Sequence, residues 1–324
     1  MNKEKEQQSC GFRTSIGGQA LIEGILMRGV DKQAIVVRSQ EEGLVTKVEE
    51  LKLIKEKYPI LGWPLIRGVV NFISSMAQGM KALTYSAQFL PEEEQEQPSK
   101  LDLWIEKKFG SEKAEKFIIA VALVVGLALA IGLFIFLPTL LVGLIPALKT
   151  GHDGLRTLLE GIVKLAIFLA YMYGVSQMKD IKRLFSYHGA EHKTIFCYEH
   201  GQELTVENVR KESRFHPRCG TSFLLVVIVL SIFVFILINA FLGVENVFLR
   251  MLVKIALLPV VVALSYELNR WLGRHDDKLI SRVLSWPGRK LQHLTTREPD
   301  DSMIEVAIEA MKLVIPDTPG ADAF

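Results

Sequence analysis

A histidine-rich segment between residues 176 and 220 contains the residues best suited to chemistry. Four of the seven histidines of the chain lie there, namely His188, His192, His200 and His216. The stretch YHGAEH within it has the pattern H-x-x-E-H, which on a helix would place His188 and His192 on one face. Two imidazoles at this spacing can bind one zinc ion, and Glu191 beside them could deprotonate a water molecule. The pattern therefore predicts a metal site with Glu191 as its catalytic base.

A site of this kind needs a third protein ligand, and the segment HPRCG offers two candidates. Either His216 or Cys219 could complete the site, and a thiolate ligand would favour zinc, with iron as the second choice, over magnesium. Glu267 and His275 are more remote candidates. A structural interpretation stays open, in which the histidines hydrogen-bond backbone carbonyls or face acidic side chains and so order the segment.

A glycine-rich segment near the N-terminus, IGGQALIEGILMRG, is a second region of interest. It lacks the Gly-Lys-Ser/Thr ending of a phosphate loop. Its glycines would permit close backbone approach, and Gln19, Glu23 and Arg28 could reach another domain or a substrate. We favour a tightly packed segment in which Glu23 and Arg28 form an internal pair.

Charge balance and cysteine content exclude several classes of protein. The 38 Lys and Arg residues against 36 Asp and Glu give a formal net charge of +2, whereas a nucleic-acid-binding domain usually carries a clear basic excess. Cys10, Cys197 and Cys219 are too few for a disulfide framework and lack Cys-x-x-Cys spacing. We expect Cys197, which lies between two aromatic residues, to be a core residue and His200 to lie in a surface turn.

Long uncharged runs indicate an integral membrane protein. About 20 apolar residues are enough to cross the hydrocarbon core as a helix. Four such runs predict four spanning helices, at residues 117–137 with an apolar extension to 148, and at 155–178, 221–244 and 247–266. The short connection at 243–246 makes the last two an antiparallel hairpin, and the lipid bilayer is the first predicted partner of the chain.

Basic residues flank these runs mainly before residue 117, between the second and third runs, and after the fourth. The polar N-terminus lacks the apolar core of a cleavable signal peptide. By the positive-inside rule, both termini and the histidine-rich segment are predicted to lie in the cytoplasm. Five charged residues then fall on the outer half of the spans: Arg156, Glu160, Lys164, Arg250 and Lys254. We favour snorkelling of these side chains to the outer headgroups over a buried charged cluster between the helices.

The sequence predicts a mainly α polytopic membrane protein with a small N-terminal β-containing cytoplasmic region. A β-hairpin is expected from the β-prone runs 34–38 and 44–48, and an amphipathic helix from Asp300, Asp301 or Ser302 to Val314. The predicted regions are an N-terminal region with the hairpin (1–57), an interfacial or packed apolar helix (58–90), a charged linker (91–116), a first transmembrane hairpin (117–178), the histidine-rich loop (179–220), a second transmembrane hairpin (221–266) and a cytoplasmic C-terminal region (267–324), within which 277–294 is interfacial.

Four segments in order, GGQALIEGILMRG, YHGAEHKTIFCYEHG, HPRCGTSF and LTTREPDD, resemble the YqhQ-like family of bacterial membrane proteins. The resemblance covers nearly the whole chain after residue 11. It implies a multi-pass protein of the bacterial cell membrane and a metal-dependent enzyme, since the family is described by general prediction in these terms. Carried over to this sequence, it points to His188, Glu191, His192, His216 and Cys219.

Two functions are compatible with these features. The leading hypothesis is a membrane hydrolase with a cytoplasm-facing metal site, acting on a peptide or lipid-linked substrate at the membrane. The alternative is a non-enzymatic membrane factor that docks onto a translocation or envelope complex, with the histidine-rich loop as structural support.

Overall fold

The computed structural model describes residues 12–51, 57–90, 110–146, 153–275 and 277–324. Cys10 and most of the predicted charged linker 91–116 lie outside these residues. The contacts divide the chain into two compact units. The first, here called the α/β unit, comprises Met1–Leu90, Met172–Val227 and Val262–Phe324, and the second, the helical unit, comprises Pro91–Tyr171 and Ile228–Val261.

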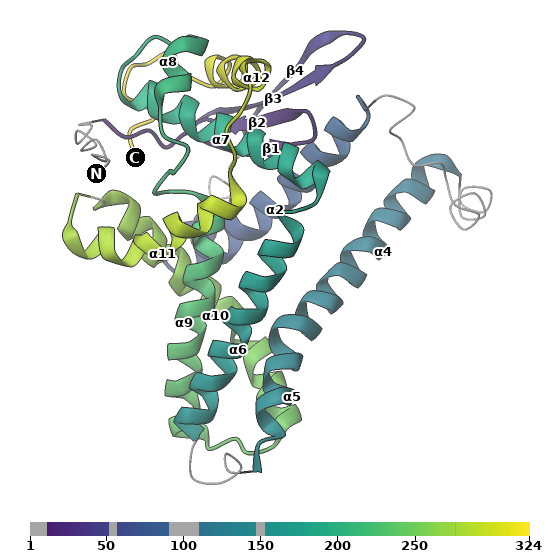
Figure 1. Cartoon of the computed structure of the whole chain (residues 1–324), viewed down its shortest axis with the longest axis vertical. Helices are drawn as coiled ribbons and strands as arrows, with labels where there is room; N and C mark the ends of the chain where they lie inside the picture. Colours follow the sequence, from purple (N-terminus) through teal and green to yellow (C-terminus); the bar gives the residue numbers. More distant parts are fainter. Residues whose placement is uncertain (1–11, 52–56, 91–109, 147–152, 276) are drawn as a thin grey trace. The chain divides into compact units, whose positions relative to one another are not determined.

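The α/β unit is built on an antiparallel sheet (Figure 1). Its strands within the described residues are β1 (Gly17–Leu21), β2 (Gly24–Arg28), β3 (Lys32–Ser39) and β4 (Gly43–Glu50), in the spatial order β1-β2-β3-β4. The predicted hairpin is confirmed as β3 and β4, which pair from Lys32 with Glu50 to Ser39 with Gly43. The glycine-rich segment also forms a hairpin, β1 and β2, although the sequence analysis predicted no strands there.

The predicted pair between Glu23 and Arg28 is wrong. Glu23 lies in the tight turn between β1 and β2, with a positive φ of 51°, and Arg28 ends β2 opposite Gly17. An extended strand rises about 3.4 Å per residue, so the two residues lie at opposite ends of the hairpin. Glu23 instead forms an ion pair with Arg183 and accepts a hydrogen bond from the Tyr187 hydroxyl at 3.1 Å.

Alternate strand residues point to opposite sides of the sheet. Both faces carry buried apolar residues, and helices cover each of them. On one face, Leu26, Ile35 and Val37 pack with Ala82 of α2 (Ile66–Ala87), which follows the short helix η1 (Pro59–Gly62). The other face packs against α7 (Lys179–Glu199) and α12 (Asp301–Lys312), with α8 (Val206–Lys211) beside both helices. The unit is therefore a helix–sheet–helix sandwich, which Figure 1 shows.

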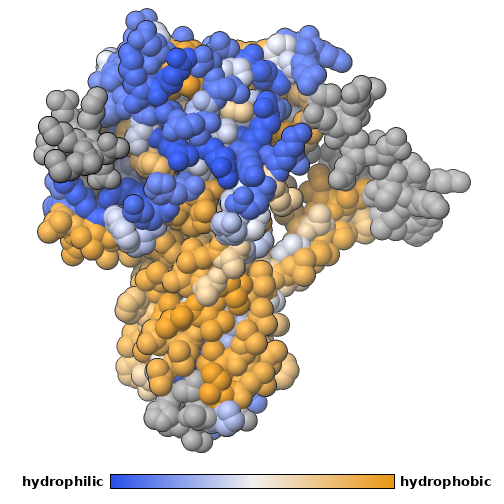
Figure 2. Space-filling view, viewed as in Figure 1, coloured by the Kyte–Doolittle hydropathy of each residue, from blue (hydrophilic) through white to orange (hydrophobic). Residues whose placement is uncertain are grey.

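Four helices in the described part of the chain are long and apolar enough to cross a membrane. The first span, Phe117–Gly143, joins α4 (Ser111–Ile131), the π-helical turn η3 (Gly132–Phe136) and α5 (Leu137–Gly143). The others are α6 (Asp153–Val175), α9 (Gly220–Leu242) and α10 (Val247–Arg274). Figure 2 shows hydrophobic residues covering the visible face of these helices. The protein is a mainly α polytopic membrane protein, as predicted.

Helix α2 is tied to the last turns of the spanning helix α10. The guanidinium of Arg67 donates two hydrogen bonds to the Glu267 carboxylate, at 2.7 and 2.5 Å. The Asn71 amide donates to the Tyr266 hydroxyl at 2.8 Å. Gly68 lies so close to Tyr266 that a Cβ atom on it would meet the tyrosine Cβ at 2.9 Å. These contacts, all within the α/β unit, fix α2 beside the end of a spanning helix.

The charged residues within the spans form a buried cluster in the helical unit, so the snorkelling prediction is wrong. Arg156, Glu160, Lys164, Arg250 and Lys254 are each at most 8% exposed. The Glu160 carboxylate forms ion pairs with Lys254, with Arg250 at 3.3 Å and with Arg156 at 3.4 Å. Lys164 donates to the Ser231 hydroxyl at 3.2 Å. A central carboxylate and nearby hydroxyl groups provide the partners that make burial of these cations possible.

Two C-terminal helices complete the α/β unit. The predicted amphipathic helix is confirmed as α12, and the Asp300 side chain caps it by accepting a hydrogen bond from the Met303 amide at 3.0 Å. Helix α11 (Leu279–Thr295) precedes it and runs through Pro287. Its exposed side carries large apolar residues: Leu279, Ile280, Val283, Leu284 and Trp286. This composition suits the interfacial position predicted for 277–294.

Candidate metal centre

Helix α7 brings two histidines together on one face. His188 and His192 are one helical turn apart, and their ring centroids lie 4.3 Å from each other. Gly189 between them leaves the helix regular and serves a packing role. A Cβ atom there would lie 2.0 Å from the carbonyl oxygen of Arg297, so the chain at Arg297 packs directly against the helix.

The close approach at Gly189 predicts that a side chain at this position lowers the stability of the fold. We expect Gly189→Ala to push the chain around Arg297 away from α7 and to lower the free energy of unfolding by about 1–3 kcal/mol, because the backbone carbonyl of Arg297 cannot rotate away as a side chain could. Thermal melting of the detergent-purified protein measures the change. Gly174→Ala is the matched control, since a Cβ atom on that helical glycine meets nothing within 4 Å. Equal melting of the two variants would contradict the prediction.

Cys219 completes a group of three potential metal ligands. It lies immediately before α9, and its Sγ atom is 3.2 Å from Nε2 of His188. One ligand atom from each of His188, His192 and Cys219 lies within 4.8 Å of the other two. Two imidazoles and one thiolate suit zinc, and three protein ligands leave a coordination position open, as in catalytic zinc sites.

Backbone carbonyls orient both imidazole rings. Nδ1 of His188 lies 2.8 Å from the Thr295 oxygen, and Nδ1 of His192 lies 2.6 Å from the Arg214 oxygen. A carbonyl oxygen can only accept a hydrogen bond, so Nδ1 is the protonated nitrogen in each ring. The Nε2 lone pair of each neutral imidazole is therefore left for the cluster. Metal-binding histidines commonly have this arrangement, which fixes both the tautomer and the ring orientation.

Glu191, which directly precedes His192 on α7, faces the same cavity as His188, His192 and Cys219. Its Oε1 atom accepts a hydrogen bond from the Gly18 amide at 3.0 Å, whereas Oε2 is buried without a hydrogen-bond partner among the described residues. Burial raises the pKa of this carboxyl group. Glu191, His188, His192 and Cys219 line one cavity of about 160 Å³. A carboxylate with one oxygen held and the other unsatisfied is suited to accept a proton there.

Electrostatics couple the thiol and the imidazoles. Burial alone would raise the pKa of Cys219, but the neighbouring His188 and His192 rings hold it well below the usual range. Burial alone would lower the pKa of His188, but Cys219 raises it to about 9. Without a metal ion, the cluster therefore favours a thiolate next to a positively charged imidazole. A thiolate is also the form of cysteine that binds metals.

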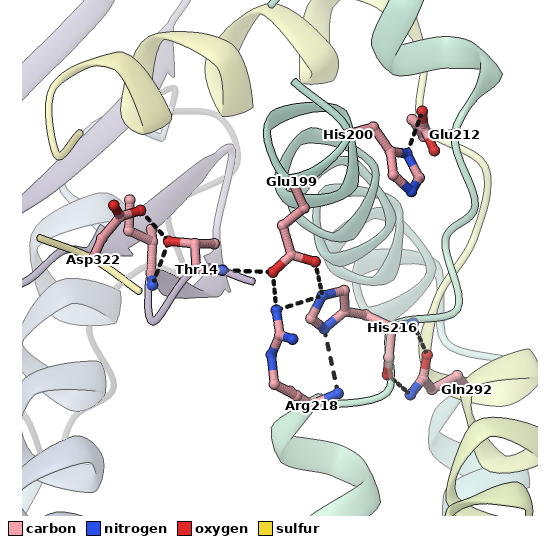
Figure 3. A network of polar contacts seen from close by, with 9 residues as sticks. Thr14, Glu199, His200, Glu212, His216, Arg218, Gln292 and Asp322 are labelled. Atoms are coloured by element: carbon pink, nitrogen blue, oxygen red, sulfur yellow. Dashed lines mark hydrogen bonds and ion pairs between the residues drawn. The ribbon is translucent and has the colours of Figure 1, made fainter. Parts of the chain in front are cut away.

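His216 lies outside this three-residue group and belongs to a neighbouring polar network (Figure 3). Its Nε2 atom is 3.7 Å from Oε2 of Glu199, and that carboxylate also contacts Arg218 and accepts from the Thr14 amide at 2.8 Å. Burial lowers the pKa of His216 to about 4, so the ring is neutral at pH 7. These contacts hold the segment that leads into Cys219, and His216 also lines the cavity of the cluster, with its ring centroid 5.5 Å from that of His192.

The remaining candidates lie elsewhere in the α/β unit. Glu267 pairs with Arg67, and Nδ1 of His275 lies 2.9 Å from the Trp271 oxygen. His200 ends α7 in an exposed turn and contacts Glu212, as expected for a surface residue. Cys197 is fully buried in the core, as predicted.

Several supporting groups could not be found from the sequence. The carbonyls of Thr295 and Arg214 and the amide of Gly18 act through backbone atoms, which carry no residue-specific signal. Glu199 is a further such group, since only the fold brings it to Arg218 and His216.

Fold and site together define a polytopic membrane protein with a His/His/Cys cluster next to the start of a spanning helix. The chain belongs to the family described as "Protein of unknown function (DUF1385)", which matches residues 63–317. It is also 34% identical over 298 residues to the "Uncharacterized protein YqhQ" of Bacillus subtilis (strain 168), a match that covers 91% of this chain and 90% of that protein. The resemblance to the YqhQ-like family is thereby confirmed. No solved structure matches the chain.

Proposed function

We propose that this protein is a metal-dependent hydrolase working at the membrane surface. His188, His192 and Cys219 would hold the ion, with zinc as the first choice and iron as the second. The observation that carries the proposal is the ring orientation: both Nδ1 atoms face backbone carbonyls, so both Nε2 atoms are available next to the Cys219 thiol. Histidines that only stabilised the fold would have no reason to leave these nitrogens around a shared cavity.

In the proposed hydrolysis, the metal ligands and Glu191 have separate roles. A bound zinc ion would supply Lewis-acid activation of a water molecule. Glu191 would take the proton from that water, because its Oε2 atom is unsatisfied and its pKa is raised by burial towards the range of a general base. Gly18 holds the other carboxylate oxygen and so fixes the direction of the base.

The position of the site at the start of α9 suits a substrate in or next to the bilayer, either a peptide or a lipid-linked molecule. The basic residues beside the spans favour an orientation with both termini and this site in the cytoplasm of a bacterial cell. In this orientation, the α/β unit would lie at the inner face of the cell membrane.

A cysteine nucleophile is a second candidate chemistry. The Sγ atom of Cys219 lies within reach of His188 Nε2, and the Thr295 carbonyl orients that ring. A nucleophile, a base and a group that orients the base form the arrangement used in covalent catalysis. This alternative requires no metal. The other proposal, a non-enzymatic factor that docks onto a translocation or envelope complex, requires none either.

Elemental analysis separates these proposals. We expect the full-length protein, purified in detergent without nickel resin, to contain about one zinc or iron ion per chain. His188→Ala and Cys219→Ser should each lose the ion, because removal of one of three ligands leaves an incomplete site. Glu191→Gln should keep it.

Matched controls come from the same helix. His200→Ala and Cys197→Ala remove one imidazole and one thiol that lie outside the cluster, so both variants should retain the metal. All variants must elute and melt as folded protein. A metal-free wild type, even after incubation with zinc, would overturn the hydrolase proposal and leave the thiol and docking alternatives.

A further inference from the structure

Arg28 lies in a second cavity of the α/β unit. This cavity has a volume of about 300 Å³ and is lined by Arg28, by Ser15 and Gly17 near the start of β1, and by Ser75 and Gln78 of α2. The guanidinium of Arg28 has neither a hydrogen bond nor an ion pair with any residue that the structure describes. Burial lowers the pKa of Arg28 while the nearby Tyr266 opposes this shift, and no carboxylate among the described residues pairs with the guanidinium. An oxyanion is the ligand that such an arginine binds best.

The groups around Arg28 suit a phosphate more than a carboxylate. A planar carboxylate can be satisfied by one guanidinium alone, through two parallel hydrogen bonds. A phosphate group carries more acceptor oxygens and benefits from donors on several sides. Here Ser15, in the segment before β1, and Ser75 of α2 bring two hydroxyl groups to the cavity from outside β2, the strand that carries the arginine.

The cavity lies beside a helix with features of a membrane interface. Helix α2 is tied to Tyr266 and Glu267 in the last turns of the spanning helix α10, and the Phe72 ring lies 6.0 Å from that of Phe223 in the first turn of the spanning helix α9. Ile73 and Met76, which flank Ser75 on α2, are 61% and 57% exposed. Apolar side chains exposed next to the ends of two spans suit the lipid headgroup region.

The metal centre and the Arg28 cavity are neighbours. Ser15, Gly17 and Gly18 line both, and Gly18 is also the residue whose amide binds Glu191. A Cβ atom on Gly17 would meet nothing within 4 Å, so the space above this glycine is open. A ligand held at Arg28 could therefore extend past Gly17 towards Glu191 and Cys219.

We propose that the Arg28 cavity binds the phosphate group of a membrane lipid and thereby places another bond of that lipid at the His188–His192–Cys219 cluster. This inference rests on the proposed function in naming its substrate class, a phosphate-bearing lipid. Arg28 is then a specificity-determining residue, because it contacts the phosphate and not the reacting bond.

Binding of a short-chain lipid to the full-length, detergent-purified protein tests the inference. The probe is dioctanoyl phosphatidic acid, and dioctanoylglycerol has the same chains without the phosphate. We expect the wild type to bind the phosphatidic acid at least tenfold more tightly than dioctanoylglycerol, and Arg28→Gln to remove this preference. Arg28→Lys should keep part of it, since lysine retains the charge without the bidentate geometry. Gly17→Leu should weaken binding by filling the passage.

Arg38→Gln is the matched control, because Arg38 lies in the same sheet but pairs with Glu305. It should bind like the wild type. Equal binding of the two probes, or wild-type binding by a folded Arg28→Gln variant, would overturn the proposal. Inorganic phosphate that competes as well as the phosphatidic acid would overturn the assignment to a lipid. Metal content is measured on the same samples, and a metal-free protein that still binds phosphatidic acid through Arg28 would support the lipid site while rejecting the hydrolase.

Discussion

Glu160→Gln is expected to lower the free energy of unfolding by about 3–5 kcal/mol, the usual effect of removing one partner from a buried ion pair. Glu160 is the carboxylate that contacts Arg156, Arg250 and Lys254, and all of these side chains are buried in the helical unit. Glutamine keeps the size of the side chain but leaves these cations without a counter-charge. The cost is the desolvation of charges that no longer have a nearby anion.

Unfolding of the purified protein by sodium dodecyl sulfate, followed by tryptophan fluorescence, measures this effect. The matched control is Glu207→Gln, which removes a carboxylate paired with Lys211 on the exposed surface of α8 and should leave the unfolding midpoint unchanged. Glu160→Gln combined with Lys254→Met should be more stable than Glu160→Gln alone, because it also removes one of the uncompensated charges. A Glu160→Gln protein as stable as the wild type would mean that the cations reach water or headgroups.

This cluster shows how far a sequence can predict a membrane fold. The four spans could be recognised because each is a long apolar run, and this signal needs no knowledge of neighbours. The burial of Glu160 could not be predicted from the sequence. Whether its carboxylate reaches the headgroups or lies between helices depends on how the helices pack against one another. The contact with Lys254 joins residues 94 positions apart, and only the packed helices determine it.

The sheet offers a similar comparison. Strands β3 and β4 have β-prone runs separated by a polar turn, so the sequence predicted them. Strands β1 and β2 were missed because the glycines of this segment favour turns and each strand has only five residues. Their hairpin also separates Glu23 from Arg28, because the extended strand β2 lies between the two residues.

For the candidate site, spacing along one helix predicted the neighbourhood of His188, Glu191 and His192, since a helix repeats every 3.6 residues. The choice between His216 and Cys219 as the third group depended on the path of the chain between α8 and α9. The His216 ring faces Glu199 although it borders the same cavity, and Cys219 is the group that approaches His188. Such long-range choices are set by the fold and not by local spacing.

Cys219 should react with iodoacetamide as a thiolate over a wide pH range in the metal-free protein. Because its pKa is well below the usual range, the thiolate is present at neutral pH and is lost only as the pH falls through that lowered value. An ordinary cysteine is only about 3% thiolate at pH 7, so the thiolate fraction of Cys219 should be roughly 30-fold higher. The imidazolium of His188 supports this form up to a pH of about 9, where it loses its proton.

The measurement is the alkylation rate of the Cys219 peptide by mass spectrometry between pH 6 and pH 9, in a Cys10→Ser background after removal of metal by a chelator. We expect a nearly flat profile for Cys219. An ordinary thiol would instead react about tenfold faster for each pH unit below its pKa of about 8.5. His188→Ala should make the Cys219 rate rise with pH, since it removes one of the two imidazoles that stabilise the thiolate, and added zinc should protect Cys219 in the wild type only. A rising profile in the wild type would contradict the thiolate–imidazolium pair, and with it the electrostatic basis of both the metal-binding and the nucleophile proposals.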